Sequence, residues 1–157
     1  MNLVDPRVSA HLDGLVPARP KRLVAMERHA AETDFPIIGP AAGHFCYLIA
    51  RMIGARSVFE LGSGFGYSTA WFARAVQENG GGSVHHVVWD ESLSEQAREH
   101  LGSLGFEDIV RYHVGEAVET LRQVMESSGG GLVSLAPGRF VTVREFCHAQ
   151  VGALPPE

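Results

Sequence analysis

The chain has 157 residues, of which 45% are hydrophobic and 20% charged, and its formal net charge is −5. This composition predicts one soluble globular domain and excludes an intrinsically disordered chain. The acidic balance argues against a broad nucleic-acid surface, and no apolar run or leader-like N-terminus suggests a membrane or an export route, so a cytoplasmic location is expected by default.

The first third of the chain predicts helices. Lys21–Thr33 has three apolar residues at helical spacing and is expected to form an amphipathic helix. Phe35–Pro40 is bracketed by prolines and reads as a stiff connector, after which a helix resumes over Ala41–Met52. Ser57–Leu61 is short and apolar, with β-branched and aromatic members, and indicates a buried parallel strand.

A glycine-rich loop follows this strand and leads into a helix predicted over Ser68–Gln77. Gly62, Gly64 and Gly66 allow positive φ and a close approach of the backbone to a ligand, and the helix start favours an anionic group. The third glycine comes one residue early for the dinucleotide fingerprint, and no Gly-Lys-Ser/Thr sequence marks a phosphate-binding P-loop.

The ligand of this loop is suggested by Glu60, which lies two residues before the first glycine. A carboxylate there suits a cationic ligand end better than a pyrophosphate. Together with the glycine spacing it favours S-adenosylmethionine, which carries an ammonium, a sulfonium and a carboxylate. The alternative is that Glu60 only ends a strand and the glycines only make a turn.

Two further acids follow predicted strands. Asp90 comes after a strand over Val84–Trp89, where it could accept the ribose hydroxyls of an adenosine or cap the next helix. Glu116 follows a strand over Ile109–Val114 and could meet the adenine amino group or start a helix as a solvated acid. The alternation of strands and helices predicts an α/β fold, a Rossmann-like, doubly wound and mostly parallel sheet.

The eight histidines raise the alternative of a metal site, which their spacing does not favour. His85 and His86 are adjacent on a strand and point to opposite faces, and the other histidines show no close pairing at i+3 or i+4 with a second ligand type that would make a convincing zinc site. Core or surface positions are therefore expected, and no metal ligand is predicted. His44 and His113 flank predicted ligand-binding segments and are the two worth testing.

At this point the residues resemble a known family, the cation-dependent O-methyltransferases of the caffeoyl-CoA and catechol type, in the bacterial branch of the class I S-adenosylmethionine-dependent enzymes. The matching segments cover a little over half of the chain in the expected order: Phe35–Pro40, Phe59–Ser68, the Asp90 position and Tyr112–Ala117.

The resemblance implies a role for each matching residue. Ile38 would lie over the cofactor, and Glu60 with the Gly62–Ser63 backbone would hold its methionine end. Ser68 would bond the carboxylate and Asp90 the ribose. Glu116 and Ala117 would border the adenine. The expected cofactor-binding set is therefore Ile38, Glu60, Gly62, Ser63, Gly64, Gly66, Ser68, Asp90, Glu116 and Ala117.

The chain departs from the family after about residue 124. The family's divalent cation is expected to need an aspartate-rich strand and a later Asp-Asn pair, but no aspartate occurs beyond Asp108. We expect one methyltransferase-like domain made of N-terminal helices (1–56), a cofactor-binding core (57–124) and an atypical tail (125–157), with Leu132–Ala136 as a short strand. The tail reads as a truncation or a shifted reading frame, which would leave the first strand near an edge that pairs with another chain, as in a homodimer.

Two functions from different classes are expected from this reading. The first is methyl transfer from S-adenosylmethionine to an oxygen of a small hydroxyl acceptor, for which the resemblance suggests a phenol; no catalytic residue is assigned. The second is a non-catalytic S-adenosylmethionine-binding remnant or assembly module without the family's metal site. A nicotinamide-dependent oxidoreductase is disfavoured by the glycine spacing.

Overall fold

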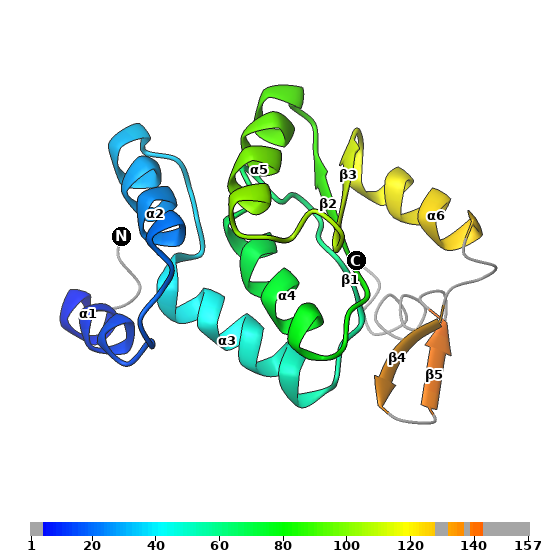
Figure 1. The fold of residues 1–157 in the computed structure, drawn as a ribbon, viewed down its shortest axis with the longest axis horizontal. Helices are drawn as coiled ribbons and strands as arrows, with labels where there is room; N and C mark the ends of the chain where they lie inside the picture. Colours follow the sequence, from blue (N-terminus) through cyan, green and yellow to red (C-terminus); the bar gives the residue numbers. More distant parts are fainter. Residues whose placement is uncertain (1–4, 128–131, 137–138, 143–157) are drawn as a thin grey trace, which may run out of the picture.

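The computed structural model describes residues 5–127, 132–136 and 139–142 of the chain. Helices and strands alternate from the third helix to the fourth strand (Figure 1). The elements are α1 (Pro6–Gly14), α2 (Lys21–Thr33), α3 (Gly39–Met52), β1 (Ser57–Phe59), α4 (Tyr67–Glu78), β2 (Ser83–Val88), α5 (Glu91–Ser103), β3 (Val110–Val114), α6 (Ala117–Ser127), β4 (Leu132–Ala136) and β5 (Arg139–Thr142).

The central sheet is parallel, in the order β1-β2-β3, and β4 and β5 form a separate antiparallel pair. Helices α4 and α5 contact β2, and α6 lies on the side of the sheet away from them (Figure 1). Each parallel connection is made by a helix, as a crossover between parallel strands requires. The predicted α/β class and mostly parallel sheet are confirmed.

Most predicted boundaries are close to the observed ones. Helix α2 has the predicted bounds, and β4 coincides with the predicted strand Leu132–Ala136. Helix α3 begins at Gly39, two residues earlier than predicted, because Pro40 occupies the first turn, where its missing N–H costs nothing. Of the predicted tail, residues 128–131, 137–138 and 143–157 lie outside the described residues.

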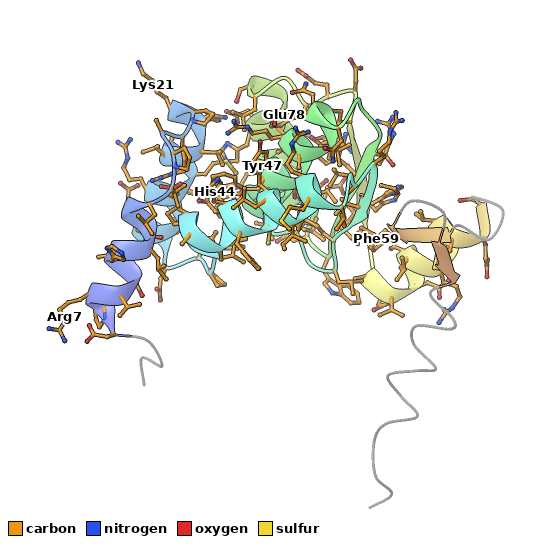
Figure 2. The ribbon with its side chains drawn as sticks, turned by 90° about the horizontal axis from the view of Figure 1, so that it is seen from below. Arg7, Lys21, His44, Tyr47, Phe59 and Glu78 are labelled. Atoms are coloured by element: carbon orange, nitrogen blue, oxygen red, sulfur yellow. The ribbon has the colours of Figure 1, made fainter. Side chains whose placement is uncertain are left out.

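The core forms where α4 is enclosed by its neighbours. Helix α4 is buried on nearly all sides, with Trp71 and Val76 almost inaccessible to solvent. It packs closely on α3, because a Cβ at Gly43 would lie 2.2 Å from Trp71 Nε1. The same two helices are joined at the surface, where the Tyr47 hydroxyl donates to Glu78 Oε2 at 2.5 Å (Figure 2).

Two surfaces beside this core are left open in the described part of the chain. Strand β1 is paired only with β2, so it lies at an edge of the sheet, as expected. Helix α3 and its C-cap residue expose an apolar row at helical spacing, composed of Phe45, Leu48, Ile49, Met52 and Ile53. Every helix within the described residues is too short or too polar to cross a membrane.

Candidate functional site

A pocket lies where the connector before α3 meets the loop between β1 and α4. Gly64 and Phe35 mark the crossing, since a Cβ on Gly64 would lie 3.0 Å from the Phe35 ring. The residues that line the pocket come from these two segments and the first turn of α4: Phe35, Pro36, Ile37, Ile38, Gly62, Ser63, Gly64, Phe65, Tyr67 and Ser68.

The glycines of the loop are required by backbone geometry and by space. Gly64 has a φ of +52° and Gly66 a φ of +92°, both in the left-handed region. Gly66 directly precedes α4, and a Cβ there would lie 3.1 Å from the Ala97 Cβ of α5. A side chain at either position would disturb the loop or its packing.

The loop is fastened to the sheet and to the core behind it. Ser63 continues the strand pairing, because its N–H donates to the Val87 carbonyl at 2.9 Å and its Oγ accepts from the Val87 N–H at 3.0 Å. The Phe65 ring is buried and lies against the rings of His29, Phe35 and His100. Loop conformation is therefore fixed before any ligand arrives.

Glu60 lies behind the loop in a buried position. Its Oε2 accepts a hydrogen bond from Thr69 Oγ1 at 2.5 Å. Burial raises the pKa of the Glu60 carboxyl, and hydrogen bonds from the side chains of Ser68, Thr69 and Ser63 act in the opposite direction. The carboxylate is thus held by hydroxyl groups at the start of α4, next to the pocket-lining Ser63 and Ser68.

Asp90 lies at the carboxyl end of β2 and is fully exposed. It is the N-cap of α5, since its Oδ1 accepts from the Ser92 N–H at 2.8 Å. The hydrogen bonds from Ser92 lower the pKa of Asp90. The helix-cap alternative is therefore what the structure shows, and it leaves Asp90 outside the lining of the pocket.

Glu116 and Ala117 begin α6 and are also outside the lining of the pocket. Glu116 Oε2 accepts from the Glu119 N–H at 2.5 Å, so this carboxylate caps the helix start. Trp89 was predicted as the last residue of the strand, but β2 ends at Val88 and Trp89 is 74% exposed.

The two histidines selected from the sequence lie in different settings. His44 stacks on Tyr47 in α3, with ring centroids 5.8 Å apart. A hydrogen bond joins Nδ1 of His85 and Nε2 of His113, which lie 3.0 Å apart. Within the described ranges, no three histidine, cysteine or acidic side chains are grouped so that they could hold a metal ion.

Comparison with known proteins gives this site a context. A family described as "Methyltransferase domain" matches residues 59–135, which include the glycine loop. The chain is 29% identical over 131 residues to a catechol O-methyltransferase of Niastella koreensis, and 34% identical over 118 residues to one of Mycobacterium tuberculosis. Over these segments the chain is similar to O-methyltransferases, and the family that it matches is one of methyltransferase domains.

These alignments cover different shares of the two partners. They take in 82% and 74% of the chain but 58% and 53% of the two relatives, so the chain spans little more than half the length of the curated relatives it matches. A solved O-methyltransferase from Bacillus cereus, in complex with SAH, superposes with a TM-score of 0.68 at 26% identity, over 76% of the chain and 55% of that structure. The fold is thus that of the class I methyltransferases.

Against this family background, the structure brings only part of the predicted set together. The pocket is lined by five of its members, Ile38, Gly62, Ser63, Gly64 and Ser68, and Gly66 and Glu60 support it from the loop and from behind. Tyr67 was missed: it lines the pocket while its hydroxyl donates to Glu27 Oε1 of α2 at 2.8 Å. That partner lies 40 residues away along the chain, so no local pattern could show it.

Proposed function

We propose that the chain binds S-adenosylmethionine in this pocket and transfers the methyl group to a hydroxyl oxygen of a small phenolic acceptor. The observation that carries the proposal is the convergence of two distant segments on one pocket. Ile38 comes from the connector, whereas Gly62, Ser63, Gly64 and Ser68 come from the loop and the start of α4. Gly64 supports the proposal because a residue without a side chain lets a ligand approach the backbone closely.

In this proposal each residue binds a different part of the ligand. Glu60 and the Gly62–Ser63 backbone take the methionine ammonium side, and Ser68 bonds the carboxylate at the N-terminus of α4, where free N–H groups favour negative charge. The carboxylate of Asp90 reaches the ribose while it caps α5. Glu116 and Ala117 border the adenine.

Proteins similar to this chain support the choice of ligand and acceptor. The Bacillus cereus O-methyltransferase was solved in complex with SAH, and both curated relatives are named catechol O-methyltransferases. When bound, S-adenosylmethionine supplies an electrophilic methyl group on its sulfonium. The chain's part is to hold the ligand in one orientation and to keep the loop rigid around it.

The divalent cation expected for the family does not fit the described residues. They contain no group of three side chains that could hold such an ion. We therefore derive no catalytic step through a metal. The same observation favours a second candidate function, in which the chain binds the adenosyl ligand without turning it over.

Two further expectations from the sequence stay proposals. The first is that residues 1–157 work as one domain, with the described loop and pocket in its 57–124 core. The second is that two copies associate through the open edge of β1 and the apolar row of α3, which both lie uncovered in the described part of the chain. The cytoplasmic location also stays a prediction.

Calorimetric titration of the full chain with S-adenosylmethionine, S-adenosylhomocysteine and NAD tests the pocket. We expect both adenosyl ligands to bind and NAD not to bind. Ser68→Ala removes a pocket hydroxyl and should weaken binding about tenfold or more, as expected for a hydrogen bond to a charged group. Ser9→Ala, on the exposed surface of α1, is the matched control and should bind as the wild type does.

Turnover is measured separately, as methyl transfer to catechol and related phenols with and without magnesium. Transfer supports the enzyme. Binding of both adenosyl ligands with no transfer to any acceptor supports the binding-only candidate. A folded chain that binds neither adenosyl ligand refutes the pocket assignment itself.

A further inference from the structure

His86 is a fully buried histidine in the middle of β2, and its ring points at the glycine loop. Its Nε2 lies 3.1 Å from the Gly64 carbonyl oxygen, and the exposed fraction of the residue is 0%. A carbonyl can only accept a hydrogen bond, so Nε2 carries the proton. The other ring nitrogen, Nδ1, is buried without a hydrogen-bond partner in the described structure.

This contact differs from the other fastening points of the loop. Ser63 is held by the backbone of Val87, and the Gly66 N–H donates to the Ser63 carbonyl at 3.0 Å. These bonds hold Ser63 and Gly66, the residues before and after the peptide that joins Gly64 to Phe65. Within the described residues, His86 supplies the one side-chain hydrogen bond to the carbonyl of that peptide.

The orientation of this peptide decides where its N–H points. No peptide bond of the described chain is cis, and in a planar trans peptide the C=O and the following N–H point in opposite directions. Because the Gly64 carbonyl is directed at His86 in the core, the Phe65 N–H is directed away from it. That N–H makes no hydrogen bond to other described residues, and Gly64 and Phe65 both line the pocket.

We propose that His86 is a positioning residue, which fixes the Gly64–Phe65 peptide so that the Phe65 N–H is presented to the anionic end of the bound ligand. The inference rests on the proposed function, since it assumes that the pocket takes an adenosyl amino acid. It assigns a role in ligand binding to a residue that the sequence alone indicated only as a core or surface histidine. His86 acts through the loop and does not contact the reacting atoms.

The test compares three variants of the full chain by titration with S-adenosylhomocysteine. His86→Leu keeps the apolar volume but removes the donor, and we expect about tenfold weaker binding, the effect of one well-placed hydrogen bond. His86→Gln restores an N–H donor near the position of Nε2 and should recover most of the affinity. His85→Leu is the matched control, because it lies on the same strand but faces the other side of the sheet, and it should bind as the wild type does.

The outcomes separate this inference from the proposed function. Failure of the wild-type chain to bind refutes the function. Wild-type binding with undiminished affinity in a folded His86→Leu variant refutes the positioning role alone, as does weak binding by His86→Gln and His86→Leu alike. Should His86→Leu not fold, the ring nitrogens of His86 are observed by NMR in the wild-type chain, where protonation at Nδ1 instead of Nε2 overturns the proposal.

Discussion

Buried His86 makes the stability of the fold depend on pH in a predictable way. Burial of the ring lowers its pKa from the ordinary 6.5 to about 4, against a smaller opposing effect of the hydrogen bond to Gly64. Between these two values the unfolded chain binds a proton at this position that the folded chain does not bind. Stability from this group is therefore fully present above about pH 6.5 and is lost as the pH falls toward about 4.

The magnitude follows from the size of the shift. One pKa unit corresponds to about 1.4 kcal/mol, so a change from 6.5 to about 4 is worth ~3 kcal/mol of unfolding free energy. This is a large share of the unfolding free energy of a whole domain, which is typically about 5–15 kcal/mol. A single buried ring should therefore be visible in the acid limb of the stability curve.

Urea denaturation of the wild type and of His86→Gln, from about pH 7.5 down to about pH 4, measures this contribution. Burial also lowers the pKa of His85, His100 and His113, but these groups are common to both chains and cancel in the difference. We expect the wild type to lose ~3 kcal/mol more than the variant over this range. Parallel pH curves for the two chains, or an NMR titration of His86 with an ordinary midpoint, would refute the reasoning.

Three other predictions follow from the same region of the structure. Gly66→Ala combines a positive φ with a contact on Ala97 and should destabilise the fold by roughly 2–4 kcal/mol in urea denaturation, whereas Gly54→Ala, where φ is also positive but the space is open, should cost only about 1–2 kcal/mol; equal losses would contradict the steric argument. Burial raises the pKa of Glu60, so folding disfavours its charged form, and this penalty grows as the pH rises through the folded-state pKa. Glu60→Gln should therefore be more stable than the wild type at about pH 8. It should nevertheless bind S-adenosylhomocysteine more weakly in calorimetry. Met52→Glu, in the apolar row of α3, should shift the chain toward the monomer in light scattering, and an unchanged mass would argue against that face as the contact between two copies.

Local signals were sufficient for most of the elements. Lys21–Thr33 was predicted with its observed bounds because its apolar spacing is regular and a proline precedes it. Ser57–Leu61 was predicted two residues too long, because β1 ends at Phe59 while the pairing with β2 continues through the Glu60 N–H to the His85 carbonyl at 3.0 Å. Apolar character alone does not distinguish a strand from a loop that keeps the strand's hydrogen bonds.

In the site too, features with a local sequence pattern could be predicted, whereas contacts between distant residues could not. The glycine loop was recognised from its own pattern, whereas Ile38 was placed beside it only through the family resemblance, and the structure puts both in one pocket. Asp90 had two readings that sequence could not separate, and the hydrogen bond to the Ser92 N–H shows that it caps α5. The contact between His86 and Gly64 spans 22 residues and depends on strand register, which no local pattern records.

The loop of the pocket is held mainly by residues that lie behind it. Glu60 bonds to Thr69, Ser63 to Val87, and Tyr67 reaches Glu27 in α2, so the loop is held by strand, helix and N-terminal segment at once. A loop held in this way loses little entropy when a ligand binds, which favours affinity. None of these contacts involves an acceptor-activating group. In the proposed function these contacts serve ligand binding, and methyl transfer is measured separately from it.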